Sequence, residues 1–300
     1  MSQFPPIAQM LWMLLLVGTG GCAVVNMNDE REQCLELLKR EMHQNSGWVR
    51  VHAADALLDH QQTAVVAAAF AQDAELGTGE YRVGAWRAMA RAASTESARK
   101  EFAERIRNVM LDTAAADRLQ AVESLCKLNA ANPADHAAIQ EWLRSANDAV
   151  APYPCWYLVL SSSGGLREAA EERLARLMDS PDALARVRSA YAIARLKQVS
   201  PATLARLQQR FEVEQPDSIA RIYLIIALMH HTSDPVVISQ LREVLLRYAV
   251  QGKPGEQLAA ATALGELGCK DDRNVLRSLL DQPEADARIG AADGLLYLLP

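Results

Sequence analysis

The chain has 300 residues, half of them apolar, which is enough to bury a sizeable core in one large domain or two medium ones. Ala and Leu dominate the apolar content and aromatic residues make up only 5%, a composition that favours helices over sheets. The formal net charge of −6 argues against the basic stripe that nucleic-acid binding requires, so we expect no nucleic-acid partner.

The N-terminus carries an apolar run over residues 7–17 that is too short to span a bilayer but suits the central region of a signal peptide. The segment resembles a bacterial lipoprotein signal, in which cleavage before a cysteine leaves Cys22 to be acylated. Gly21 matches the residue before the cut, whereas Thr19 departs from the usual Leu or Val. The resemblance implies a signal peptide over 1–21, a tether over 22–29 and a lipid-anchored protein in the cell envelope.

Two alternatives to lipidation remain open. The segment also fits a conventional secretory signal, which would place the protein free in the periplasm or outside the cell. Translation could instead begin at Met27, which would leave a cytoplasmic protein.

A sequence frame then recurs through the rest of the chain, as in WVRVHAADAL near residue 50 and DARIGAADGL near residue 288. Its occurrences lie 31 to 36 residues apart, which indicates a repeat architecture. The eight marker positions of the frame are Arg50, Arg82, Arg118, Pro152, Arg186, Arg221, Gln257 and Arg288.

Residues one, four and seven positions after each marker are apolar, aromatic or small, and steps of three and four place them on one stripe of a helix. Another helix precedes each marked helix, as over 31–44, 97–111 and 167–180. A capping residue followed by proline signals helix starts at Asn132-Pro133, Ser200-Pro201 and Asp234-Pro235, and at Ser180-Pro181 for a marked helix. We therefore predict an all-α fold, a right-handed α-solenoid of about eight helix pairs.

These repeats resemble HEAT repeats of the short bacterial kind, including those of phycobilin lyases, over residues 30–300. The match is best at Ala53-Ala54, at residues 260–265 and at Ala291-Ala292, and weakest around Pro152. The resemblance implies a curved rod on the order of 80 Å long, because adjacent helix pairs pack about 8–10 Å apart. It also implies that the marked helices line a concave surface suited to a protein partner.

Tyrosine and arginine gather at the outward positions of the middle marked helices, a composition that is typical of interface hot spots. We predict a partner-binding face there, and the alternative is that the rings pack between repeats and tighten the stack. The predicted contact residues are Tyr157, Tyr191, Arg188, Arg195, Tyr223, Ile226 and His230.

No pattern in the sequence points to catalysis, so we expect a non-enzymatic protein without metal or cofactor. His230 and His231 are adjacent and point about 100° apart on a helix, and no carboxylate stands at ligand spacing. Four cysteines, Cys34, Cys126, Cys155 and Cys269, lack metal spacing and are expected to be buried thiols. The alternative function is a ligand-handling HEAT-like protein, such as a chromophore lyase or a chaperone-like adapter.

The last predicted helix ends in the apolar segment GLLYLLP over residues 294–300. Terminal repeats normally present a polar outer face, because an uncovered apolar end aggregates. Either these side chains turn inward onto the preceding repeat, or the end of the rod docks on a partner or on a second copy of the chain.

Overall fold

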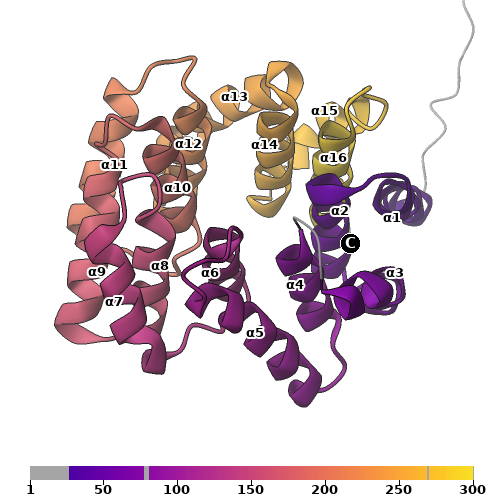
Figure 1. Ribbon diagram of the computed structural model, residues 1–300. Coiled ribbons are helices and arrows are strands. Elements are labelled where there is room, and N and C mark those ends of the chain that lie inside the picture. Colours follow the sequence, from indigo (N-terminus) through magenta and orange to yellow (C-terminus); the bar gives the residue numbers. More distant parts are fainter. Residues whose placement is uncertain (1–26, 78–80, 269, 300) are drawn as a thin grey trace, which may run out of the picture.

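The computed structural model describes residues 27–77, 81–268 and 270–299. Within these ranges the chain forms sixteen α-helices and two short 3₁₀ helices, η1 (Pro133–Asp135) and η2 (Lys270–Asp272), and no strand. The all-α prediction is confirmed. The helices form successive pairs, and one helix of each pair faces the interior of the molecule (Figure 1).

The outer helices are α1 (Met27–Gln44), α3 (Thr63–Leu76), α5 (Glu96–Leu111), α7 (His136–Ser145), α9 (Gly164–Leu177), α11 (Pro201–Val213), α13 (Pro235–Gln251) and α15 (Arg273–Ser278). The inner helices are α2 (Gly47–Asp59), α4 (Arg82–Ala92), α6 (Arg118–Lys127), α8 (Pro152–Ser161), α10 (Ala183–Ala194), α12 (Ile219–His231), α14 (Pro254–Glu266) and α16 (Ala285–Leu298). Each inner helix contains one of the eight marker positions.

The helix starts follow the capping chemistry of the sequence. The side chains of Ser200 and Asp234 accept hydrogen bonds from the first backbone N–H groups of α11 and α13, and a proline follows each of them. The prediction at Ser180-Pro181 was wrong by two residues, because Asp182 is the cap of α10. The Ser180 hydroxyl instead donates to Asp148 at 2.7 Å.

The predicted helical stripe forms the core. The position four residues after the marker is buried in all eight repeats, and the alanines that hold it in four of them let adjacent inner helices approach closely. These residues are Ala54, Trp86, Val122, Trp156, Ala190, Ile225, Ala261 and Ala292.

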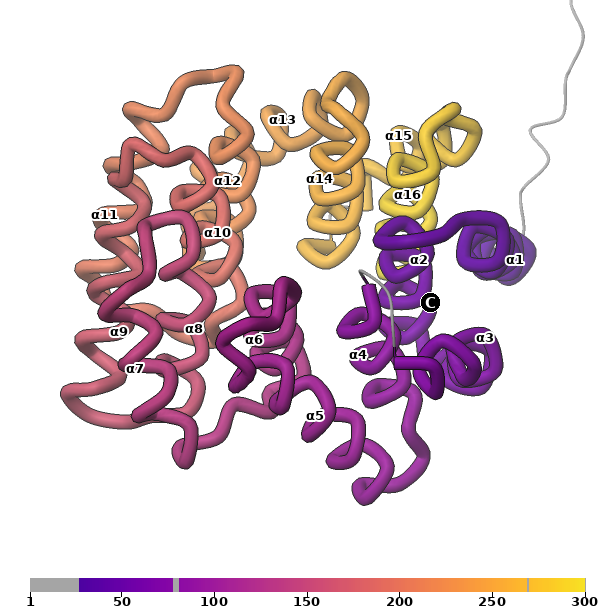
Figure 2. Tube along the Cα trace, in the orientation of Figure 1, coloured from indigo at the N-terminus to yellow at the C-terminus, as the bar shows by residue number. Residues whose placement is uncertain are grey.

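The pairs follow one another around a ring, and its two ends meet (Figures 1 and 2). The last inner helix, α16, contacts both α1 and α2, which belong to the first pair. The expectation of a curved rod was therefore wrong, because the eighth pair contacts the first.

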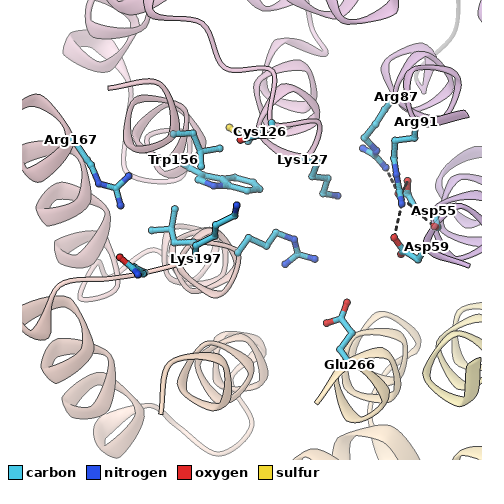
Figure 3. A pocket seen from close by; sticks show the side chains of 15 residues that line it. Asp55, Asp59, Arg87, Arg91, Cys126, Lys127, Trp156, Arg167, Lys197 and Glu266 are labelled. Carbon is cyan, nitrogen blue, oxygen red and sulfur yellow. Dashed lines mark hydrogen bonds and ion pairs between the residues drawn. The ribbon is translucent and has the colours of Figure 1, made fainter. Parts of the chain in front are cut away.

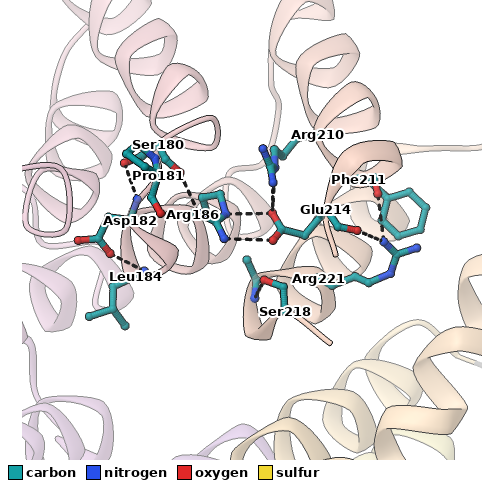
Figure 4. Close-up of polar contacts among 11 residues, drawn as sticks. Ser180, Pro181, Asp182, Leu184, Arg186, Arg210, Phe211, Glu214, Ser218 and Arg221 are labelled. Atoms are coloured by element: carbon teal, nitrogen blue, oxygen red, sulfur yellow. Dashed lines mark hydrogen bonds and ion pairs between the residues drawn. The ribbon is translucent and has the colours of Figure 1, made fainter. Parts of the chain in front are cut away.

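An arginine–glutamate contact joins neighbouring repeats within the ring (Figure 4). Arg186, the marker of α10, donates two hydrogen bonds to the Glu214 carboxylate of the next repeat, at 2.9 and 3.1 Å. The same guanidinium donates to the backbone carbonyls of Ser180 and Pro181 at 2.8 and 3.0 Å. The Arg186 side chain thus binds both the turn that precedes α10 and the end of the adjacent outer helix, α11.

The closing contact of the ring repeats this chemistry. Arg288, the marker of α16, donates twice to the Glu41 carboxylate of α1, both at 2.9 Å. It also donates to the carbonyls of Gln282 and Pro283, both at 2.7 Å. Those carbonyls lie six and five residues before the arginine, as they do for Arg186. The first repeat therefore occupies the place that a ninth repeat would take.

Further polar and aromatic contacts cross this seam between the first and last pairs. The Glu30 carboxylate of α1 accepts from Arg273 and from Arg277, the latter at 2.9 Å. On the inner side, His52 lies 3.1 Å from Asp286 and the buried His60 lies 2.9 Å from Asp293. The imidazole of His60 also packs edge-on against the Tyr297 ring, with centroids 4.8 Å apart.

The closure covers most of the apolar C-terminal segment. Leu295, Leu296 and Leu299 are buried, and Tyr297 is partly exposed beside His60. The described chain therefore has no open apolar end of the kind that led us to expect a second copy. Self-association stays a prediction.

Acidification is expected to loosen the seam. Burial alone would raise the pKa of Glu30 and Glu41, but the hydrogen bonds and charges of Arg273, Arg277 and Arg288 outweigh it and hold both below the ordinary 4.5. A carboxyl group with a lowered folded-state pKa stabilises the fold above its ordinary pKa, and this stabilisation is lost as the pH falls through the folded value. Hydrogen exchange, corrected for intrinsic rates, should therefore show α1 and α16 losing protection below pH 4.5. Unchanged or increased protection there would contradict the expectation.

Candidate functional site

The centre of the ring holds a cavity of about 930 Å³ lined by inner helices and the turns that follow them (Figure 3). Its walls carry charge rather than a continuous apolar surface. Six lining residues are cationic, namely Arg87, Arg91, Lys127, Arg167, Arg195 and Lys197, and three are acidic, namely Asp55, Asp59 and Glu266.

One side of the cavity, the ion-pair wall, consists of Asp55 and Asp59 on α2 with Arg87 and Arg91 on α4. Arg87 donates to Asp55 at 2.5 Å and to the Ser124 hydroxyl at 3.1 Å, and Arg91 donates to Asp55 at 3.1 Å and Asp59 at 2.5 Å. Burial opposes ionisation of Asp55, yet the nearby cations, Arg87 first, hold its pKa well below the usual range. The two aspartates and two arginines of this wall therefore neutralise one another.

Asp59 behaves differently from Asp55 although they lie one turn apart. Burial raises the pKa of Asp59, and the charges of Asp293 and Asp55 add to that effect against Arg91. Burial likewise raises the pKa of Glu266 on α14, with Asp293 and Asp59 contributing, although Arg195 acts in the opposite direction. The acidic groups at this edge of the cavity therefore carry their negative charge less readily than free carboxyl groups.

The opposite side carries a cluster of four rings, here called the aromatic wall, of which Trp156 lines the cavity and the others pack beside it: Tyr153 and Trp156 on α8, Tyr191 on α10 and Tyr223 on α12. Their rings meet in tilted or edge-to-face pairs with centroids 6.0–6.3 Å apart. Burial raises the pKa of Tyr223 to about 12. The predicted alternative, that these rings tighten the stack, thus describes part of what they do.

Cations lie on this aromatic wall. The guanidinium carbon of Arg195 lies 3.7 Å from the centroid of the Tyr191 ring, and that of Arg188 lies 5.8 Å from the Tyr153 ring. Lys127 pairs with Glu123 at 2.8 Å and also approaches the Tyr191 ring. Of the predicted contact residues, Tyr191, Tyr223, Arg188 and Arg195 come together here.

His230, another predicted contact residue, is exposed at the end of α12, 3.9 Å from Glu266. Burial of its ring and the charge of Arg195 lower its pKa. Ile226 is only 8% exposed, so its prediction as a contact residue was wrong: the side chain belongs to the core.

The prediction for Tyr157 was also wrong, because this side chain is fully buried and points away from the cavity. Its hydroxyl accepts from the Asn132 backbone N–H at 2.8 Å and donates to Asp135 at 2.6 Å. In α8 the residues one and four after the marker, Tyr153 and Trp156, contact the Tyr191 ring instead. This repeat has Pro152 at the marker position, so no arginine sets the frame from which Tyr157 was predicted.

Tyr157→Phe is expected to lower the free energy of unfolding by about 1–2 kcal/mol, because it leaves the Asn132 backbone N–H without a partner and removes one hydrogen bond from the buried Asp135 carboxylate, which keeps those of Arg107. Partner binding should not change. Tyr248→Phe is the control, since the Tyr248 hydroxyl donates to the Pro216 carbonyl at an exposed site. Urea denaturation measures the stability, and a Tyr157→Phe variant that weakens binding at unchanged stability would contradict the reassignment.

Other predicted residues can be placed or lie outside the described ranges. Cys34, Cys126 and Cys155 are buried free thiols, as predicted, and burial raises the pKa of each. Cys269 and Cys22 lie outside the described residues, as does the whole signal-like segment. No set of three or more His, Cys, Asp or Glu side chains in the described parts of the chain is arranged to hold a metal ion.

Across residues 27–77, 81–268 and 270–299, no helix is both long enough and apolar enough to cross a membrane. No protein-family model matches the chain. No curated protein matches it significantly.

Proposed function

We propose that this chain is a non-enzymatic, HEAT-like binding protein that accepts a segment of a partner protein into the centre of its ring. The observation that carries the proposal is the position of Arg195, whose guanidinium lies on the aromatic wall and, among the described residues, makes no ion pair or protein hydrogen bond. A cation held in a cavity without a direct ionic partner is a group available to a ligand.

The chemistry of the cavity supports binding rather than catalysis. Among the described residues, Cys126 is the one thiol in the lining, and burial raises its pKa, which disfavours the reactive thiolate. Asp55 is hydrogen-bonded to Arg87 and Arg91 and has a lowered pKa, so it serves poorly as a proton acceptor. Arginines and Trp156, residue types that are common in recognition surfaces, also line the cavity.

The N-terminal sequence adds a location to this proposal. Acylation at Cys22 would anchor the ring to a membrane outside the cytoplasm, through a short tether that ends near the start of α1. Mass spectrometry of the mature N-terminal peptide tests this. A diacylated or triacylated peptide beginning at Cys22 is expected, whereas an unmodified peptide starting at Met1 or Met27 would refute the anchor.

Site-specific photo-crosslinking tests where the partner binds. The photoreactive residue p-benzoylphenylalanine is placed at Tyr223, beside the cavity, and separately at Arg176, which is exposed on α9. We expect one partner band from position 223, diminished by Arg195→Ala, and none from position 176. Equal crosslinking from both positions, or a band unaffected by Arg195→Ala, would contradict binding in the ring.

A small-molecule ligand is the second candidate, because about 930 Å³ lies within the size range of small-molecule sites. This is the ligand-handling alternative. Native mass spectrometry of the protein from its own host distinguishes the two: a bound small molecule would favour this candidate, and a ligand-free chain that crosslinks from position 223 would favour the protein segment.

A further inference from the structure

We propose that Arg195 and Lys197 form an oxyanion site in the cavity, which recognises a carboxylate or phosphate group on the bound ligand. This inference rests on the proposed function, because it specifies the chemical group that the ring holds. It begins from the geometry of Arg195 at the end of α10.

Stacking on Tyr191 fixes the plane of the Arg195 guanidinium. With its face on the ring at 3.7 Å, the five N–H donors point outward along the edge of the plane. No described protein acceptor uses those donors. A planar fork held in place before binding suits the two parallel hydrogen bonds that a carboxylate or phosphate accepts.

Lys197 adds a second cation three residues from the end of α10. It lines the same cavity, is exposed and makes no ion pair with a described residue. In Figure 3 its side chain lies on the same side of the cavity as Trp156 and Lys127, opposite the ion-pair wall. Two cations without an ion pair therefore share one side of the cavity.

Two carboxyl groups near Arg195 would repel an incoming anion, and the negative charge of each is reduced. Glu123 is neutralised by Lys127 at 2.8 Å. Glu266 lies near enough to raise the pKa of Arg195, but burial raises the pKa of Glu266 itself and makes its negative charge less favourable. The aromatic side of the cavity thus stays positive within a chain of net charge −6.

Isothermal titration calorimetry with the purified chain tests the site. The probes are inorganic phosphate, succinate and a hexaglutamate peptide. We expect at least one probe to bind, with an affinity that falls as salt rises and that drops at least tenfold in Arg195→Gln and less in Lys197→Gln. Arg195→Lys should bind at an intermediate level, since lysine keeps the charge but lacks the planar fork.

The control is Arg176→Gln, which removes an exposed arginine on an outer helix and should leave binding unchanged. Binding of the peptide alone identifies a chain-borne carboxylate, and binding of phosphate or succinate alone identifies a free anion. No binding of any probe, or equal binding by wild type and a folded Arg195→Gln variant, would overturn the oxyanion site. Crosslinking from position 223 that persists in that case would leave the proposed function standing.

Discussion

Replacing Gly294 with alanine is expected to lower the free energy of unfolding by about 3 kcal/mol, because α14 and α16 pack backbone against backbone. A Cβ atom at Gly294 would lie well under 3.0 Å from the Ala261 carbonyl oxygen, closer than real Cβ contacts occur. A Cβ atom at Gly265 or Gly290 would also lie under 3.0 Å from backbone atoms across the same interface. The two helices must separate to admit the methyl group, and urea denaturation measures the cost.

Gly165→Ala is the matched control, because it also replaces a helical glycine but nothing lies within 4 Å of the added Cβ. Alanine there should leave stability unchanged or raise it by up to about 1 kcal/mol through helix propensity. If Gly294→Ala behaved like Gly165→Ala, the close packing of α14 on α16 would be refuted.

Removing the charge of Glu41 is expected to open the ring at its seam. The Glu41 side chain is 3% exposed and accepts two hydrogen bonds from Arg288, so Glu41→Gln leaves a mostly buried cation without its anion. Breaking such a pair costs about 3 kcal/mol. The measurable result is a lower urea midpoint together with faster hydrogen exchange in α1 and α16.

Glu214→Gln provides the comparison, because Glu214 makes the equivalent contact with Arg186 inside the ring. It should also lower stability, but the loss of exchange protection should be greatest around α10 and α11 rather than at the seam. Glu36→Gln removes only an exposed pair with Lys39 on α1 and should change neither measurement. Unaltered protection of α1 and α16 in Glu41→Gln would show that other contacts suffice to close the ring.

The core and the pairing of helices could be read from the sequence because both depend on local periodicity. A stripe at steps of three and four residues specifies which side of each helix is buried, and capping residues specify where many helices begin. The site was predicted in part for the same reason: Tyr191, Tyr223, Arg188 and Arg195 share outward positions on consecutive inner helices. The prediction for Tyr157 was wrong because its repeat lacks the arginine marker that fixes the position of the frame.

A further signal was present but needed the structure to be understood. The pattern proline–acid–Ala or Ser–any–Ala–Arg occurs at 181–186, 216–221 and 283–288. In the first and last of these, the arginine binds the two carbonyls five and six residues before it and a glutamate of the adjacent outer helix. The pattern predicts that Arg288 needs a carboxylate, but nothing in it points to Glu41.

The series of packed helix pairs follows from local sequence, because each amphipathic stripe must be buried by its immediate neighbours in the chain. That the series closes could be seen only in the folded chain, since closure depends on small rotations summed over eight repeats and pairs Arg288 with Glu41, about 247 positions apart. Closure in turn converts an expected concave face into a central cavity that stays open to solvent. There the charges of distant helices shift one another's pKa values, and Arg195 is left facing the interior without an ion pair.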